Sequence, residues 1–220
     1  RHLSIDSLAA LIQLFGHSGQ YQQQIISQLH TATILATCCH NGAFHPTAYF
    51  SQGRFQTTGE AGMWSRGQAW GMLGLCRAAA QWGEPYLTHA QSACQYWTNS
   101  RPGPLPPDRL NNSSGLCDPS AAVITSLAML ALADLLPDGK LWRLQAHQSI
   151  TAIIHSPFFT GFYQNNASPN NKIGIDSGIF CGSCYQTKRG KEELVETAWG
   201  SFFLMAALCI LTGVIKSDHC

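Results

Sequence analysis

The sequence predicts an all-α protein built from repeated helical hairpins. Apolar periodicity predicts helices over 4–15, 18–36, 67–82, 84–99, 118–135, 139–154 and 197–213. The first, third, fifth and seventh of these are apolar nearly all round, whereas the other three are one-sided. The two kinds alternate along the chain, and short turn sequences join them. This alternation predicts inner and outer helices that close into a toroid.

Each element follows from its own residues. The stretches that predict inner helices are 8–15, 70–80, 121–136 and 202–211. One-sided helices are expected on the outer surface, as Tyr21, Ile25, Leu29, Ala32 and Ala36 or Tyr86, Ala90, Ala93, Cys94 and Trp97 illustrate. The long insert over 37–63 has some strand-like alternation, so we expect a short hairpin near 40–57.

Composition excludes some classes of protein. With 220 residues and 45% hydrophobic content, the chain can bury a substantial core, and no linker divides it. Its 13 basic and 12 acidic residues form no long run of one sign, which argues against a nucleic-acid partner. The longest apolar stretch, 202–215, falls short of the roughly 20 residues that a membrane span needs. We therefore expect one domain over 1–220, with no nucleic acid and no membrane span.

The nine cysteines and three glycosylation sequences favour a secreted or lumenal glycoprotein with disulfides. The sequons begin at Asn111, Asn112 and Asn166. A cytosolic protein with many buried thiols is the alternative. Cys181 and Cys184 have the spacing of a redox or half-zinc site, but no second pair stands at ligand spacing, so we expect a local disulfide or plain thiols and no metal.

Polar and aromatic residues gather at the N-terminal ends of the inner helices. Because those helices are expected to be parallel, Asp6, Trp64, Arg66 and Trp70 should meet around one mouth. Gln68, Asp118, Ser120, Glu196 and Trp199 stand at the same helix ends. The hairpin is expected to bring His45 and Gln56 to that mouth as well. Helix N-termini attract anions, and a guanidinium binds a carboxylate or phosphate through paired hydrogen bonds.

Each of these residues also has a plainer interpretation. Asp6 and Asp118 fit helix caps, the reading that we retain for Asp118. Arg66 could simply pair with Glu60 or Asp118, and both tryptophans could be core rings. His45 could be structural, and Gln56 alone carries no signal.

The run Trp64-Ser65-Arg66-Gly67-Gln68-Ala69-Trp70 resembles the Trp-Ala-Arg-Gly-Gln-Ala-Trp signature of the unsaturated glucuronyl hydrolases, glycoside hydrolase family 88. Ile5-Asp6 with its following apolar residues resembles the family's catalytic-aspartate helix, and 45–50 its histidine-containing strand. Gln56 stands eight residues before Trp64, as the family's substrate-contacting glutamine does. Segments from Asp118 and Trp199 resemble later family segments, although Ser201 replaces the usual aspartate. The similarity runs from about residue 4 to 212.

The resemblance implies an (α/α)6 barrel, here incomplete, with about seven of twelve helices and the N-terminal helices absent. It also implies hydration of the C4=C5 double bond of an unsaturated uronic acid at the non-reducing end of lyase-generated oligosaccharides. Asp6 would be catalytic, and His45, Gln56, Trp64, Arg66 and Trp70 would bind the sugar. No cofactor or metal is implied.

The family's second aspartate has no match in the chain, and Glu60 is only a speculative substitute. The chain begins at Arg1 without a methionine or signal-like segment, so we expect a cut precursor or part of a longer protein. A fragment or partner chain could then complete the barrel. The alternatives are an inactive carbohydrate-binding or structural component of an extracellular assembly and, less favoured, an inverting glycosidase, which needs two separated carboxylates.

Overall fold

The computed structural model describes residues 2–16, 18–111, 115–161, 178–188 and 191–217. Its helices are α1 (Leu8–Gly16), α2 (Tyr21–Cys38), α3 (Ser65–Trp82), α4 (Tyr86–Ser100), α5 (Pro119–Leu135), α6 (Lys140–Ile154) and α7 (Ala198–Leu211). All seven predicted helices are confirmed. The largest difference lies at the start of the chain, where β1 (His2–Ser4) ends at the first residue of the predicted helix and α1 begins only at Leu8.

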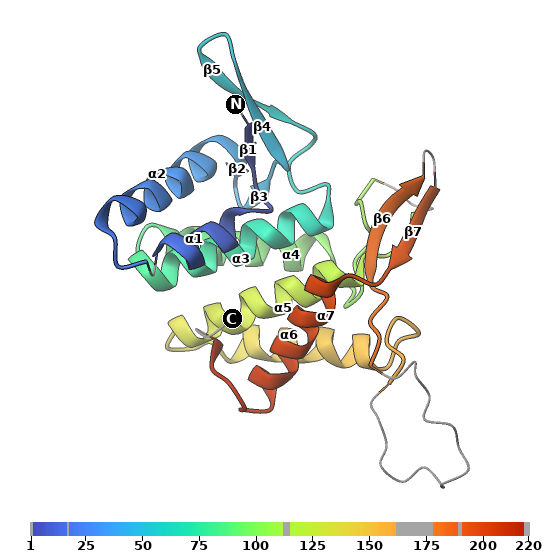
Figure 1. The fold of residues 1–220 in the computed structure, drawn as a ribbon. Coiled ribbons are helices and arrows are strands. Elements are labelled where there is room, and N and C mark those ends of the chain that lie inside the picture. The colour runs from blue at the N-terminus through green and yellow to red at the C-terminus, as the bar shows by residue number, and fades with distance from the viewer. Residues whose placement is uncertain (1, 17, 112–114, 162–177, 189–190, 218–220) are drawn as a thin grey trace, which may run out of the picture.

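The helices form an open arc of inner and outer layers (Figure 1). Along the inner layer α1 packs against α3, α3 against α5 and α5 against α7. The outer helices α2, α4 and α6 pack mainly on α1, α3 and α5 respectively. The predicted alternation of inner and outer helices is therefore confirmed, and the inner helices lie in one continuous row.

The core lies around α3 and α5, as their sequences require. Every residue of α5 from Pro119 to Ala133 is buried, because this helix has neighbours on several sides. Small side chains let the helices approach closely. At Gly74 of α3, a Cβ atom would collide with the side chain of Leu8, so this glycine permits the contact between α1 and α3. Full burial of a leucine such as Leu8 contributes about 1.5–3 kcal/mol.

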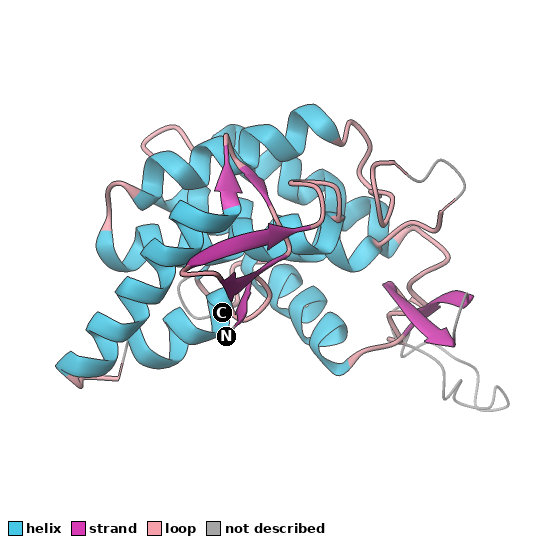
Figure 2. Ribbon diagram, turned by 90° about the horizontal axis from the view of Figure 1, so that it is seen from above, coloured by secondary structure: helices cyan, strands magenta, loops and turns pink. Residues whose placement is uncertain are grey.

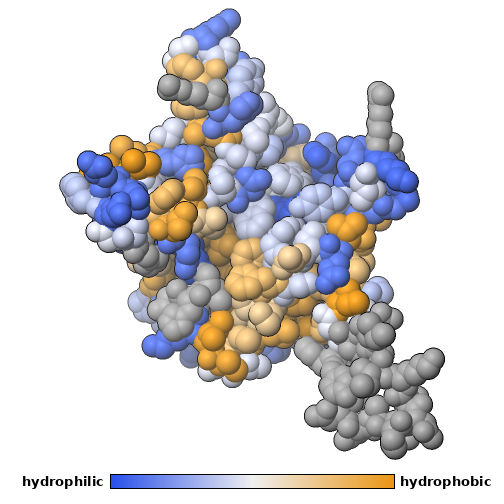
Figure 3. Space-filling view, in the orientation of Figure 1, coloured by the Kyte–Doolittle hydropathy of each residue, from blue (hydrophilic) through white to orange (hydrophobic). Residues whose placement is uncertain are grey.

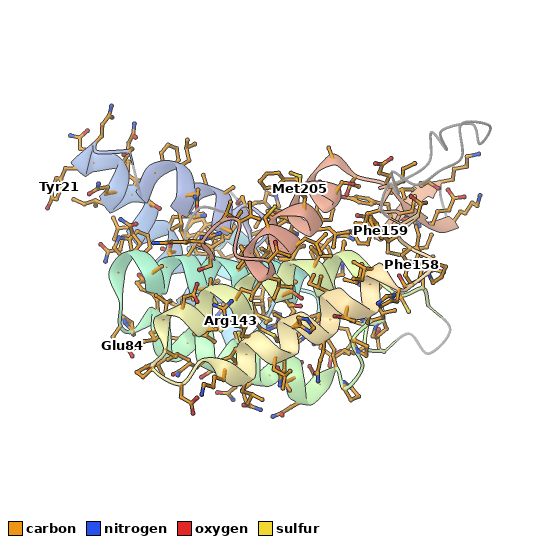
Figure 4. All side chains as sticks on the ribbon, turned by 90° about the horizontal axis from the view of Figure 1, so that it is seen from below. Tyr21, Glu84, Arg143, Phe158, Phe159 and Met205 are labelled. Carbon is orange, nitrogen blue, oxygen red and sulfur yellow. The ribbon has the colours of Figure 1, made fainter. Side chains whose placement is uncertain are left out.

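The one-sided outer helices behave differently from one another. On α4 the apolar stripe packs inward, and both Ala90 and Trp97 are buried. On α2 the packed face contains Ser27 and Thr31, while the apolar stripe faces outward, with Leu29 63% exposed. Figure 4 shows Tyr21 at the outer end of this helix. Periodicity identified α2 as a helix, but it did not determine which face would be covered.

The strands form small additions to the helices, with one pair set apart from the others (Figure 2). β1, β4 (Thr47–Ser51) and β5 (Arg54–Thr58) make an antiparallel sheet in the order β1-β4-β5, with Tyr49 opposite Gln56. β2 (Cys39–His40) pairs with β3 (Ala43–Phe44). The expected hairpin near 40–57 is therefore confirmed. A second hairpin, β6 (Ser183–Lys188) with β7 (Lys191–Val195), precedes α7 and was not predicted.

The eight cysteines of the described residues are all free thiols. The structure therefore shows none of the expected disulfides among the described residues, and Cys181 and Cys184 stand in it as plain thiols. Of the sequon asparagines, Asn111 lies in an exposed turn, whereas Asn112 and Asn166 lie outside the described residues, as does Cys220. No helix in the described ranges has both the length and the apolar character of a membrane span.

Candidate active site

A pocket of about 830 Å3 opens between α1, α3, α7 and β6. Five of the residues expected at the mouth line it: Asp6, Trp64, Arg66, Trp70 and Trp199. Its other walls come from Ser7, Ala9, Ala10, Gln13, Leu73, Arg77, Tyr185, Phe202 and Phe203. The prediction that the ends of the inner helices meet at one mouth is confirmed for these five residues. Figure 3 shows hydrophobic surface over α1 and between α1 and α7, on the face shared with Figure 1.

Arg66 lies at the centre of the polar side of the pocket, in the first turn of α3. Its guanidinium donates to Asp118 at 2.5 Å and to the carbonyl of Cys184 at 3.0 Å. It also lies over three rings, at 4.7 Å from Tyr185, 5.4 Å from Trp64 and 5.7 Å from Trp199. The plain interpretation of Arg66 as a partner of Asp118 is thus correct, and the same side chain faces the pocket.

Asp118 is fully buried at the N-terminal end of α5. It stands at the cap position, as predicted, but its side chain makes no capping hydrogen bond. The carboxylate instead accepts from Arg66 and from the hydroxyl of Ser120. Burial raises the pKa of Asp118 to about 6, although Arg66 and Ser120 both act to lower it. The carboxyl group that balances the charge of Arg66 is therefore a weaker acid than an ordinary aspartate.

A neighbouring strand-like segment holds Trp64 in place. Trp64 pairs as an isolated β-bridge with Arg109, and the N–H of Ser65 donates to the carbonyl of Asp108 at 2.9 Å. The Trp64 side chain also hydrogen-bonds to the Asp108 carboxylate, whose pKa is raised by burial. At Gly67 a Cβ atom would collide with the Trp64 ring. The signature glycine therefore allows the ring to lie against the first turn of α3.

Three aromatic rings from α3 and α7 pack together in the pocket wall. The ring of Trp70 lies 5.6 Å from that of Trp199 and 5.5 Å from that of Phe203, between centroids. Trp199 and Phe203 come from the first turns of α7, and Trp70 comes from the second turn of α3. Such rings provide apolar faces for the C–H groups of a sugar ring.

Asp6 stands between β1 and α1, at the rim of the pocket. Its carboxylate accepts a hydrogen bond from the hydroxyl of Ser4, and the residue is exposed. Asp6 is therefore open to solvent among the described residues. Among these, Asp6 is also the single acidic side chain in the lining, because Glu60 and Glu196 are exposed outside it.

His45 and Gln56 do not line this pocket. His45 makes a 2.9 Å hydrogen bond through Nδ1 to the carbonyl of Gly59, and Gln56 accepts one from the hydroxyl of Tyr49 at 2.7 Å. Gln68 is buried and links α3 to the carbonyl of Gly42 and the N–H of Phe44. The hairpin therefore brings neither His45 nor Gln56 into the pocket of this structure, and the substrate-binding roles of these two residues stay predictions.

The sequence argument missed Tyr185, which covers the guanidinium of Arg66 from β6. A signal was present, because two short polar and apolar stretches flank a turn-like Lys188-Arg189-Gly190-Lys191. One further cluster lies close by. Within the described ranges, the donor atoms of Asp108, Cys184 and Glu192 lie within 4.8 Å of one another. Arg66 and Arg109 place positive charge beside this cluster, which disfavours a cation there.

The similarity of this chain to known proteins is found in its fold. The sequence matches no protein-family model and no curated protein. Among solved structures, the chain is similar to an unsaturated glucuronyl hydrolase from Bacillus sp. GL1, described as responsible for the degradation of glycosaminoglycan, with a TM-score of 0.76 and 21% identity. The match covers 96% of this chain and 58% of that one. The chain has the fold of the unsaturated glucuronyl hydrolases.

Two further structures of unsaturated glucuronyl hydrolases give similar matches. One, described as specific for heparin, gives a TM-score of 0.77 at 18% identity over 97% of this chain and 60% of that chain. A mutant of the Streptococcus agalactiae enzyme, solved with dGlcA-GalNAc6S, gives 0.71 at 17% identity, over 93% of this chain and 57% of that one. The chain thus spans less than two thirds of these structures and forms part of the unsaturated glucuronyl hydrolase barrel.

Proposed function

We propose that this chain belongs to a hydrolase that removes unsaturated uronic acid from the non-reducing end of lyase-generated oligosaccharides. The observation that carries the proposal is the pocket that unites Asp6, Trp64, Arg66 and Trp70. These are the residues that match the family signature and its catalytic-aspartate helix. The shared fold supports the assignment.

The walls of the pocket suit an anionic sugar. Trp64 and Trp70 supply ring faces for its carbon skeleton, and Arg66 supplies a positive charge toward its carboxylate. We propose that His45 and Gln56 also contact the substrate. Either the β4–β5 hairpin moves toward the pocket, or the two residues contact sugar groups that extend outside it. No cofactor enters the proposed reaction.

In the proposed reaction Asp6 first protonates C4 of the unsaturated ring. The same carboxylate then accepts a proton from the water that attacks C5, so that water adds across the C4=C5 bond. The resulting hemiketal opens and releases the remaining sugar. Because the glycosidic oxygen is not displaced directly, the usual separation between paired carboxylates is not required.

The test is loss of the ultraviolet absorbance of the conjugated uronate when the complete protein meets lyase-generated disaccharides. We expect turnover by the wild type, and we expect Asp6→Asn to lower it at least about 100-fold. Since Asp6 is exposed, the variant should keep the wild-type unfolding midpoint. Asp138→Asn, an exposed acid away from the pocket, is the matched control. Equal activity of wild type and Asp6→Asn would rule out the proposed chemistry.

The second candidate is a carbohydrate-binding or structural component that does not turn the sugar over. It is favoured by the presence of only one carboxylate, Asp6, in the described lining, and by the pairing of Arg66 with Asp118. Calorimetric binding of the same disaccharides separates the two candidates. Binding without any loss of absorbance by the complete protein would select the second.

We also propose that the protein is secreted or lumenal, as its nine cysteines and three glycosylation sequences favour.

We further propose that more helices complete the barrel. The inner helices at the two ends of the arc leave apolar side chains uncovered, with Leu14 of α1 65% exposed and Met205 of α7 57% exposed. Figure 4 shows Met205 on the side of α7 turned away from α3 and α5. The related barrels continue where this chain does not reach, so a segment or partner with apolar helical faces fits these edges.

A further inference from the structure

Two cysteines on neighbouring helices meet inside the core. Cys76 lies on α3 and Cys94 on α4, and both are 0% exposed. The two thiols hydrogen-bond to one another. The helices form an antiparallel hairpin joined by a short turn at Gly83, and they pack against each other along their lengths.

We propose that Cys76 and Cys94 form a disulfide when the protein folds in an oxidising compartment. The two S–H bonds break and one S–S bond forms, and the two protons and two electrons pass to the disulfide of an oxidoreductase or to glutathione disulfide, which is reduced to two thiols. The helices already bring the thiols into contact, so only a small further approach is needed. The bond forms before the core closes, because the packed thiols are inaccessible to an oxidant.

The same contact distinguishes these two cysteines from a lone buried thiol. A single buried cysteine packs like a small apolar residue, whereas a buried pair in contact can be covalently joined. The link would close a short loop across the α3–α4 hairpin, and α3 carries Arg66 and Trp70 at its other end. The bond would therefore restrain the helix that supplies Arg66, Trp70, Leu73 and Arg77 to the pocket. This inference is independent of the proposed reaction.

Peptide mapping tests the bond directly. The complete protein is produced through the secretory route of a eukaryotic cell, purified without reductant, and unfolded in guanidinium with iodoacetamide before trypsin digestion. Cleavage gives peptides 67–77 and 78–109, which contain Cys76 and Cys94 respectively as their only cysteines. We expect these peptides joined to each other, and separated by dithiothreitol. Full alkylation of both cysteines, or a bond from either to a different cysteine, would overturn the proposal.

Variants add an independent readout. Closing a loop of this length raises the unfolding midpoint by about 6–12 °C in a protein of this size. Dithiothreitol should remove that increment from the wild type and have no effect on Cys76→Ala, in which Cys94 becomes alkylated. Cys38→Ala, which removes another fully buried thiol, should keep the linked peptides. A wild-type midpoint that does not respond to reductant would also contradict the bond, and the peptide map decides even if a variant fails to fold.

Discussion

The guanidinium of Arg66 lies 2.5 Å from the carboxylate of Asp118, and this ion pair joins the first turn of α3 to the start of α5. Both side chains are at least nine-tenths buried. The pair therefore sets the spacing of two inner helices, and it also decides how much positive charge the pocket presents to a ligand.

Breaking this pair should destabilise the protein strongly. Asp118→Ala leaves Arg66 without its counter-charge, and we expect the free energy of unfolding to fall by about 3–5 kcal/mol in denaturant titrations. Replacing both residues by apolar ones of similar size should recover part of that loss. The exposed pair of Arg143 and Asp134 provides the control, since Arg143→Ala should cost at most about 1 kcal/mol. Similar losses for the two single variants would contradict the importance of burial.

Binding of a uronate should strengthen as the solution is acidified through pH 6. The pKa of Asp118 is raised from 3.8 to about 6, so between pH 7 and 5 the folded protein protonates this carboxyl and the charge of Arg66 is no longer neutralised. We expect affinity to rise on the order of tenfold, measured by calorimetry with an unsaturated disaccharide. Asp118→Asn should remove this pH dependence, and a wild-type affinity that is constant over the range would refute the mechanism.

The same ionisation has a defined effect on stability. Because the folded pKa of Asp118 lies above its ordinary value of 3.8, the unfolded chain loses this proton first as the pH rises. The increment that protonation of Asp118 adds to the free energy of unfolding is therefore fully present below pH 3.8 and is lost as the pH rises through about 6, where the ion pair with Arg66 takes over.

Adding a methyl group at Gly67 should displace Trp64. A Cβ atom at this position collides with the ring, so we expect Gly67→Ala to weaken binding of an unsaturated disaccharide by about 2- to 10-fold, in line with the loss of one aromatic contact. Gly103→Ala is the matched control, since nothing lies within 4 Å of the Cβ that it adds. Trp fluorescence titration measures both, and unchanged binding in Gly67→Ala would show that Trp64 does not contact the sugar.

A charge on the open edge of α1 should disturb the complete barrel. If further helices cover Leu14, Leu14→Asp should lower the free energy of unfolding of the complete protein by at least about 1.5–3 kcal/mol, the contribution of one buried leucine. Leu144→Asp, at a site 53% exposed on the outer helix α6, should change it by no more than about 0.5 kcal/mol. Equal effects of the two substitutions would mean that Leu14 stays exposed.

Local patterns of apolar residues were sufficient to predict where the helices lie in the chain. Periodicity over 70–80 and 121–136 predicted α3 and α5 as buried, and both are, because an all-apolar helix is stable only when neighbours cover it. The stripe on α2 was equally clear in the sequence, yet Leu29 is exposed. A stripe shows which face prefers cover, but only the surrounding elements decide whether that face receives it.

The site was predictable in part for the same reason. Parallel inner helices placed Asp6 and Arg66 at one mouth from helix order alone, and the pocket contains both. The position of the β4–β5 hairpin, and hence of His45 and Gln56, depends on strand pairing and on the loops that carry it. Those long-range contacts leave no periodic signal in the chain.

The sequence by itself determined the all-α class, the alternation of inner and outer helices, and the grouping of Asp6, Trp64, Arg66 and Trp70, because each depends on residues close together or on helix direction. Only the tertiary structure decided that Arg66 pairs with Asp118, that Tyr185 covers it from β6, and that Cys76 meets Cys94. Such pairings depend on how elements distant in the chain pack, since the free energy of burying two groups together is set by their three-dimensional neighbours.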